Sequence, residues 1–298
     1  REDLPEKTST VSEALDGLTG IDVRSYGGSG ARAAVSIRGA TPDQVKVYVD
    51  GMPVSGGGSG DTGLASIPIG AVESIEVYRG SAPGEFGAGA IGGVVHITTL
   101  KPMPEPEVDL GITYGSFNTW KQSLMGRFGL GETHAFSIAA GRYASDNDFR
   151  YTDDRQTPSD PTDDREVTRR NADFEQRHLL GRWLWEPASA FTVSTRLLYQ
   201  DADRGVPGLQ RDPALNARLT SDTLLGQVRC AYDDLAALRL WGSTEDRHFH
   251  DPEDEAGRQG RQNTIGDTGD PTRIGCAPVN VIIMDIQNPF GGQILGNQ

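Results

Sequence analysis

The chain has 298 residues and a formal net charge of −14, so nucleic acid and other polyanions are poor candidate partners. Hydrophobic residues make up 36% of the chain, below the roughly 45–50% of ordinary soluble domains, and its 38 glycines are nearly twice the usual share, which argues against a deep helical core. No segment approaches the roughly 18 consecutive apolar residues of a membrane-spanning helix, whereas a β-barrel needs lipid-facing residues only at alternate positions.

The first hundred residues predict a small domain that mixes one helix with short strands. Ser9 or Thr10, followed by Glu13, forms the capping-box pattern that starts a helix, here predicted over residues 11–18. Runs rich in β-branched residues, separated by glycine loops, predict strands at 21–24, 34–38, 45–50, 72–78 and 94–99. These strands are short and polar on one face, so we expect the domain to need a surrounding wall.

A proline-rich segment follows at 101–106, where prolines alternate with other residues. Proline lacks a backbone N–H and keeps the chain extended, which is typical of a linker. We therefore expect one domain at 1–100, a linker at 101–106 and a second domain at 107–298.

The second domain begins with strict alternation. Apolar side chains occupy every second position from Val108 to Tyr114, with polar or small residues between them. The same period recurs at 120–130, 135–143, 178–185, 191–199, 224–232 and 237–244, which predicts about seven strands. An apolar face and a polar face on every strand predict part of an antiparallel transmembrane β-barrel.

The connections between these strands are of two lengths. Tight turns are predicted at 129–132, 186–189 and 233–236, and long polar connections at 145–175, 200–221 and from 250 onward. Outer-membrane barrels have short turns on the periplasmic side and long loops outside. The first, third, fifth and seventh strands are therefore predicted to rise outward.

A soluble β-sandwich is the alternative, because it also alternates apolar and polar residues. Aromatic residues near the predicted strand ends, such as Tyr114, Trp120, Trp185 and Tyr199, disfavour it. A membrane barrel places its interfacial girdles at these positions.

Four glycine-containing segments of the first domain resemble a known family. They are Val-Ser-Ile-Arg-Gly at 35–39, Val-Tyr-Val-Asp-Gly-Met-Pro at 47–53, the segment 67–80 that ends in Val-Tyr-Arg-Gly, and the segment 83–99 that begins Pro-Gly-Glu-Phe-Gly. In this order and spacing they resemble the plug domain of TonB-dependent outer-membrane transporters. We call residues 1–100 the plug and the strands after residue 106 the wall.

The resemblance implies an antiparallel transmembrane β-barrel, of about 22 strands in full, with an N-terminal mixed α+β plug inside it. Because about seven strands cannot close a barrel, the chain is expected to be partial and to begin just after the TonB-binding segment. The implied location is the outer membrane of a Gram-negative cell, among lipid and lipopolysaccharide. The implied partners are TonB with ExbB and ExbD and a small nutrient ligand.

The implied function is powered import of a scarce nutrient, such as a siderophore or other iron chelate, or a corrinoid such as vitamin B12. The alternative is a surface ligand-binding subunit, or a phage or bacteriocin receptor, without powered transport. No arrangement of Ser, His, Asp or Cys in the sequence predicts an enzyme.

Arg38 and Arg79, each followed by glycine, match plug arginines that in this family face acidic residues of the barrel. The resemblance therefore predicts plug–barrel contacts here. The alternative is a local pair with Glu73 or Glu76 inside the plug, which we also count as candidate contact residues.

Two glycine-rich plug loops are expected to point toward the ligand, because glycine lets the backbone approach and rearrange around it. The alternative is a flexible tip that touches nothing. The candidate substrate-binding residues of these loops are Tyr26, Ser29, Arg32, Ser55, Ser59 and Asp61.

The outer loops are acidic, which most simply indicates solvated surface. Their clustered carboxylates could instead bind calcium, as loops of the family's vitamin B12 branch do, and no other cofactor is expected. The candidate calcium ligands are Asp153, Asp154, Asp160, Asp163 and Asp164.

Overall fold

The structure is a computed structural model. It describes residues 10–16, 18–25, 33–54, 67, 69–80, 83, 86, 91–155, 157, 162–209, 212–233, 235–252, 273–275 and 279–283. Within these ranges, no helix has the length and apolar character needed to cross a membrane.

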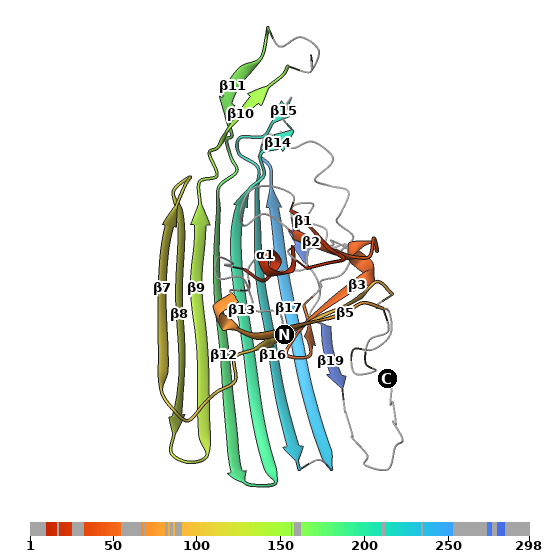
Figure 1. Ribbon diagram of the computed structural model, residues 1–298, viewed down its shortest axis with the longest axis vertical. Coiled ribbons are helices and arrows are strands. Elements are labelled where there is room, and N and C mark those ends of the chain that lie inside the picture. Colours follow the sequence, from red (N-terminus) through yellow and green to blue (C-terminus); the bar gives the residue numbers. More distant parts are fainter. Residues whose placement is uncertain are drawn as a thin grey trace.

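The plug consists of one short helix and two small sheets (Figure 1). Its elements are α1 (Val11–Asp16), β1 (Ile21–Ser25), β2 (Ala33–Ile37), η1 (Pro42–Gln44), β3 (Val45–Val49), β4 (Met52–Pro53), η3 (Ile69–Ala71), β5 (Val72–Tyr78) and β6 (Gly93–Thr99). Strands β1 and β2 pair antiparallel, while the other sheet has the order β4-β3-β6-β5, in which β3 and β6 run parallel. The predicted helix and five predicted strands are confirmed, and the short strand β4 is an addition.

A compact apolar core holds the plug together. Strand β3 buries Val45, Val47 and Val49 on one face, as its period of two requires. These side chains pack with Val95 and Ile97 of the parallel partner β6, each at 0% exposure. The core therefore forms between the larger sheet and the elements that cover it.

The wall is a nine-stranded antiparallel sheet. Its strands are β7 (Glu107–Gly115), β8 (Thr119–Leu130), β9 (His134–Ser145), β12 (Phe174–Ala188), β13 (Phe191–Gly205), β16 (Arg218–Tyr232), β17 (Ala236–His250), β18 (Arg273–Gly275) and β19 (Val279–Ile283). Each long strand pairs with the next along the chain, and both β18 and β19 pair with β17. The seven predicted wall strands are confirmed.

Two outer connections contain structure that the alternation did not predict. The hairpin of β10 (Arg150–Asp153) and β11 (Arg165–Thr168) rises between β9 and β12, and β14 (Gly208–Leu209) pairs with β15 (Asp212–Pro213) between β13 and β16. Both hairpins lie at the same end of the sheet, opposite the short turns (Figure 1). The predicted separation of long and short connections is therefore present in the structure.

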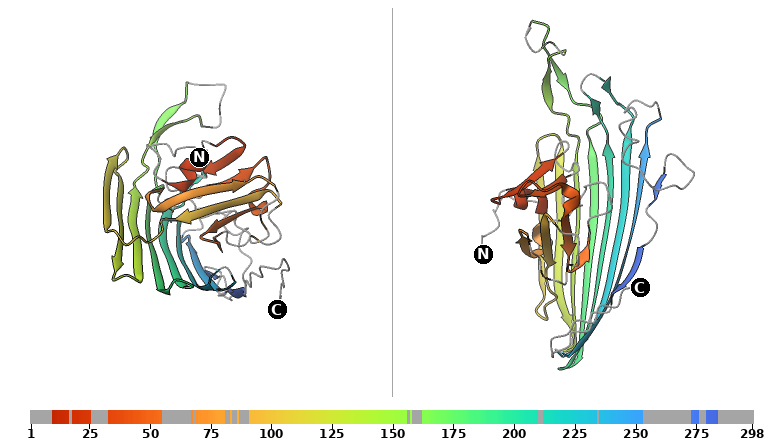
Figure 2. Two further views of the ribbon diagram at one scale, coloured as in Figure 1. Left: turned by 60° about the horizontal axis from the view of Figure 1, so that its bottom comes forward. Right: turned by 90° about the vertical axis from the view of Figure 1, so that its right-hand side faces the viewer.

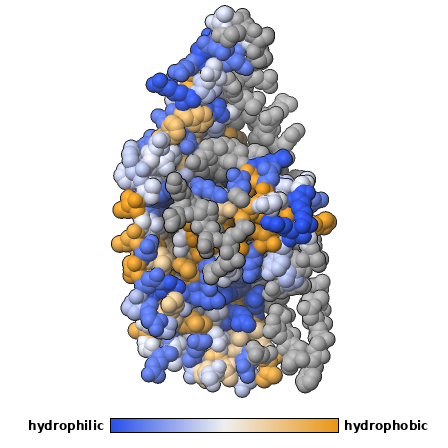
Figure 3. Space-filling model, in the orientation of Figure 1, coloured by the Kyte–Doolittle hydropathy of each residue, from blue (hydrophilic) through white to orange (hydrophobic). Residues whose placement is uncertain are grey.

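The wall curves around the plug. Seen nearly along the strands, the sheet bends around the plug, which lies on its inner side (Figure 2). The outward-facing side chains are apolar and exposed, as with Leu110 at 73% and Ile112 at 76%, and orange residues mark that margin of the molecule along β7 (Figure 3). Inward-facing side chains such as Gln227 are buried. The predicted two-faced character of the strands is thus confirmed.

Candidate functional site at the contact between plug and wall

Asp50 lies at the tight turn that joins β3 to β4, where the sequence Asp-Gly predicts such a turn. Asp50 has φ 50° and Gly51 has φ 80°, and the turn brings Val49 opposite Met52. A left-handed backbone at both positions explains the residue choice, because Asp tolerates it and glycine adopts it freely. The turn places the Asp50 side chain between the plug and the wall.

The Asp50 carboxylate is fixed from inside the plug by Thr99, at the end of β6. Its Oδ1 accepts a hydrogen bond from the Thr99 backbone N at 3.1 Å, and its Oδ2 accepts one from Thr99 Oγ1 at 2.6 Å. The Asp50 backbone N donates to the carbonyl of Ile97 at 2.8 Å. Hydrogen bonds to a carboxylate are among the stronger ones in proteins, so they hold Asp50 in one orientation.

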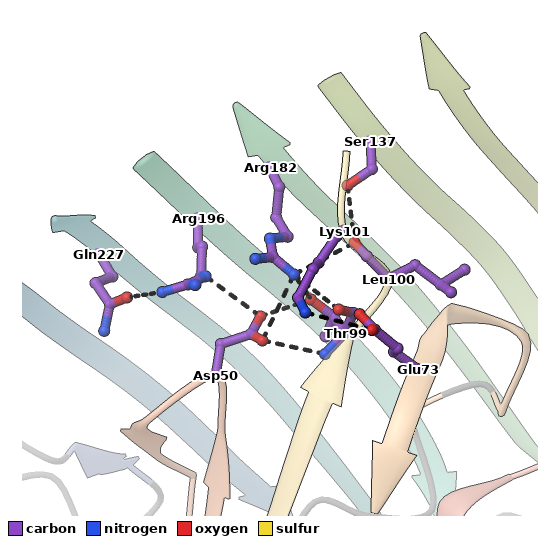
Figure 4. Close-up of polar contacts among 9 residues, drawn as sticks. All are labelled: Asp50, Glu73, Thr99, Leu100, Lys101, Ser137, Arg182, Arg196 and Gln227. Carbon is purple, nitrogen blue, oxygen red and sulfur yellow. Dashed lines mark hydrogen bonds and ion pairs between the residues drawn. The ribbon is translucent and has the colours of Figure 1, made fainter. Parts of the chain in front are cut away.

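Two arginines of the wall reach the same carboxylate (Figure 4). Arg182 Nη1 lies 3.8 Å from Oδ1, and Arg196 Nε lies 3.7 Å from Oδ2. The Asp50 side chain is only 4% exposed, and the two arginine side chains are 12% and 17% exposed. A charge that is this buried requires a partner, so the three side chains form one electrostatic unit between plug and wall.

Each arginine also makes a hydrogen bond that fixes its position. Arg182 Nη1 donates to the Thr99 carbonyl at 2.7 Å and to the Leu100 carbonyl at 3.3 Å, where β6 leaves the plug. Arg196 Nη1 donates to Oε1 of Gln227 on the neighbouring strand. Arg182 thus binds plug backbone directly, while Arg196 is oriented by the wall itself.

Apolar and weaker polar contacts surround this unit. Met52 and Ala71 of the plug are buried in one cluster with four wall side chains: Ala139, Leu180, Leu198 and Leu225. Ser137 donates to the Leu100 carbonyl at 3.2 Å, and Lys121 lies 3.8 Å from Glu13 of the plug helix. The plug is therefore held at several points along the inner face of the sheet.

Two cavities flank the contact. One, of about 250 Å³, lies between η3 of the plug and the polar inner face of β7, β8 and β9, with Lys121 and His178 in its lining. The other, of about 330 Å³, lies beside Asp50 and is lined by arginines. Phe86 closes part of it and accepts a hydrogen bond from Tyr48, whose burial raises the pKa of the phenol above its ordinary value. The contact thus borders space that can hold water.

The predicted plug–barrel residues lie elsewhere on the plug. Arg38 and Arg79 are exposed, and within the described residues neither forms an ion pair. Glu73 pairs with Lys101 at 3.4 Å, and Glu76 lies 3.3 Å from His96 Nδ1. Contact of these residues with other parts of a barrel stays a prediction.

The predicted ligand residues, Tyr26, Ser29, Arg32, Ser55, Ser59 and Asp61, all lie outside the described residues, so their role stays a prediction.

The predicted calcium ligands are partly described. Asp153 Oδ2 accepts hydrogen bonds from Arg165 at 3.0 and 3.1 Å, and Asp163 Oδ1 accepts one from Thr157 at 2.8 Å. Asp160 lies outside the described residues. Among the residues that the structure describes, no group of three or more His, Cys, Asp or Glu side chains is placed to hold a metal ion. Calcium binding stays a prediction.

The sequence contains a feature that points to this site, although the alternation of apolar and polar residues does not reveal it. Arg182 and Arg196 occupy inward-facing positions near the middle of strands that are otherwise suited to a membrane. A charged residue at such a depth is costly unless it faces a wet interior and a partner. Asp50, in one of the four plug segments, is that partner.

The family model of the TonB-dependent receptor plug domain matches residues 1–94. Among solved structures, the unliganded ferric citrate transporter FecA has a TM-score of 0.62 at 19% identity, with 84% of this chain and 39% of that chain covered. The ferric enterobactin receptor PfeA of Pseudomonas aeruginosa has a TM-score of 0.58 at 19% identity, with 80% of this chain and 38% of that chain covered. The alcaligin outer-membrane receptor FauA of Bordetella pertussis has a TM-score of 0.59 at 17% identity, with 81% of this chain and 36% of that chain covered.

These comparisons confirm the predicted fold class. The chain spans less than two fifths of the length of the three solved structures. The matched family model is that of a plug domain of TonB-dependent receptors, and FauA is described as an outer-membrane receptor. Residues 1–94 therefore form a plug domain of the TonB-dependent receptor family, and the strands that follow have the fold of part of such a receptor's barrel.

Proposed function

We propose that the full-length protein imports a ferric chelate across the outer membrane, and that TonB, with ExbB and ExbD, supplies the force. The observation that carries this proposal is the Asp50 contact, where one plug carboxylate is held by two arginines of the wall. A transporter of this kind must keep its plug seated at rest and release part of it under load.

The geometry suits both requirements. Removing one partner from a buried ion pair in a dry interior costs about 3–5 kcal/mol, which is enough to keep the plug seated. Here, however, cavities of about 250 and 330 Å³ border the contact. Each has room for several water molecules, at roughly 30 Å³ per molecule, so water can solvate the arginines as the plug moves away.

The solved structures with the same fold support the proposed ligand class. FecA is described as a ferric citrate transporter and PfeA as a ferric enterobactin receptor, which favours an iron chelate over a corrinoid. We propose that the ligand contacts the plug loops that carry Tyr26, Ser29, Arg32, Ser55, Ser59 and Asp61. In the same proposal Arg38 and Arg79 face carboxylates of the rest of the barrel.

The test is uptake and binding of radiolabelled ferric chelates by cells that produce the full-length protein, with and without the segment that precedes the plug. We expect the truncated protein to bind the chelate as well as the intact one and to import none of it. A variant in which that segment is replaced by a scrambled sequence of equal length controls for length. Uptake that survives truncation would refute the powered mechanism.

A second function is a receptor whose plug stays seated, and the burial of Asp50 favours it, because a carboxylate that is only 4% exposed and is held by two arginines resists release. The same experiment separates the two. A receptor without transport binds the chelate but imports none in either form, and a phage or bacteriocin that uses it adsorbs equally to both.

A further inference from the structure

The wall carries two pairs of arginines on its inner face, each pair directly opposite on neighbouring strands. Arg182 of β12 is the register partner of Arg196 of β13, and Arg229 of β16 is the register partner of Arg239 of β17. Like charges directly opposite one another destabilise a sheet. Each pair therefore favours an anion close to it.

For the first pair of arginines, the plug itself supplies this anion. Asp50 of the plug lies 3.8 Å from Arg182 and 3.7 Å from Arg196, as described above. This carboxylate compensates the repulsion between the two guanidinium groups. The pair shows how this wall accommodates opposed arginines.

The second pair lacks a comparable partner in the part of the chain that the structure describes. There, the side chain of neither Arg229 nor Arg239 forms an ion pair or a hydrogen bond, and Nε of Arg239 is buried. The Arg239 guanidinium lies against the plug turn, because a Cβ placed on Gly51 would be 2.8 Å from its Nη1. Glycine at this turn therefore leaves room for the arginine.

The cavity of about 330 Å³ lies where these groups meet. Arg196, Arg229 and Arg239 line it together with Asp50 and His96. Three guanidinium groups thus face one carboxylate, and that carboxylate is already shared with Arg182. A concave site with an excess of one charge raises the local concentration of ions of the opposite sign.

We propose that this cavity binds a small oxyanion through carboxylate or phosphate oxygens. The planar guanidinium group presents its donors as a fork that matches both kinds of anion. The cavity volume lies at the lower end of the range for small-molecule sites, roughly 300–1,000 Å³. The occupant would bridge Arg229 and Arg239 and reach Arg196.

The position of the site gives it a consequence for the plug. Because Arg196 also pairs with Asp50, the occupant and the plug carboxylate share one arginine. Each then weakens the hold of the other, since coupling between two sites is reciprocal. Arg239 follows close after Ala236, the first residue of β17, so the site lies in the half of the wall that is nearer the short turns. An anion there loosens the plug from the side opposite the outer hairpins.

The test is isothermal titration of the full-length protein, purified in detergent, with inorganic phosphate and separately with citrate, at constant ionic strength. We expect one of the two anions, or both, to bind with one-to-one stoichiometry. Arg229→Gln and Arg239→Gln should each weaken that binding about tenfold or more, as expected for the loss of a charge-assisted hydrogen bond. Arg150→Gln, which removes an exposed arginine of β10, should leave it unchanged.

The two anions and one further variant complete the test. Citrate binding alone would identify organic carboxylate as the ligand chemistry, and phosphate binding alone would identify phosphate. Asp50→Asn removes the competing carboxylate and should tighten anion binding severalfold. This variant still tests the proposal if the arginine variants fail to fold. Binding of neither anion, or equal binding by all arginine variants, would overturn the proposal. None of these readouts requires TonB. Anion binding can therefore be refuted while powered import holds, and powered import can be refuted while anion binding holds.

Discussion

Asp50 and Thr99 lie 49 positions apart in the sequence, yet the Asp50 carboxylate accepts hydrogen bonds from both the backbone N and the Oγ1 of Thr99, at 3.1 and 2.6 Å. Asp50 directly follows strand β3 and Thr99 ends the parallel strand β6, so the two strand ends meet at one edge of the plug. That edge faces the wall, and the fixed carboxylate becomes the point at which the wall arginines hold the plug.

Replacing Asp50 with asparagine should loosen the plug. Asp50→Asn keeps an oxygen for Thr99 but leaves Arg182 and Arg196 without their anion, at a cost of about 3 kcal/mol. Hydrogen exchange of the β3 and β6 amides in the full-length protein should show faster opening. Asp16→Asn is the matched control because Asp16 is exposed at the end of the plug helix. Equal exchange in the two variants would mean that the arginines do not hold the plug.

Gly93 should not tolerate a side chain. It has φ +139°, and a Cβ added there would lie 2.5 Å from the Tyr78 backbone carbonyl oxygen. Gly93→Ala should therefore destabilise the plug by about 1–3 kcal/mol, through backbone strain together with the clash. Gly70→Ala is the control, since a Cβ at Gly70 meets nothing within 4 Å. The midpoint of thermal unfolding of the plug measures both, and a midpoint for Gly93→Ala that equals the control would contradict the geometry.

Asn171 should anchor the outer connection between β13 and β16. Its Nδ2 donates to the carbonyls of Val206, Ala214 and Ala217 at 3.2, 3.0 and 2.8 Å. Asn171→Asp removes the donor but tolerates the φ of 52°, so it should expose this connection to protease. Asn171→Gly preserves the backbone conformation as well and should have the same effect. If protease cleaves the connection no faster in either variant than in the unmodified protein, the Asn171 amide is not the anchor.

A charged residue introduced on the outer face of the wall should destabilise the protein. Leu124 of β8 is 40% exposed and is the register partner of Leu110 on that face, whereas Ser123, one position along the strand, lies on the inner face. Leu124→Arg should destabilise the protein in lipid bilayers by about 2–4 kcal/mol, as expected for arginine near the membrane midplane. Ser123→Arg should cost far less. Denaturant titration of liposome-embedded protein measures the difference, and equal costs would contradict the assigned faces.

Much of the fold could be predicted from the sequence because the wall repeats one simple pattern. The alternation at Val108 to Tyr114 is a local property of the chain, and it determines which face meets lipid. The strands run further than predicted at their outer ends, where β16 begins at Arg218 among polar residues. Backbone pairing continues there without any apolar alternation to reveal it.

The candidate site could not be predicted in the same way. The resemblance pointed to Arg38 and Arg79, neither of which forms an ion pair within the described residues. The contact at Asp50 depends on the register that places Arg182 opposite Arg196, and on the docking of the plug against those strands. Both are long-range relationships that a single sequence does not encode locally.

The central claim is that the plug is seated on the wall at this contact and must leave it during import. Met52 of the plug and Leu225 of the wall share one buried cluster, so they are suitable positions for a cleavable thiol cross-link, with Cys230 and Cys276 replaced by serine. The measurement is uptake of a ferric chelate by cells that carry the cross-linked full-length protein, before and after the link is cleaved. The account predicts normal binding throughout, no uptake while the link is intact and recovery on cleavage. Uptake at the full rate with the link quantitatively in place would contradict it.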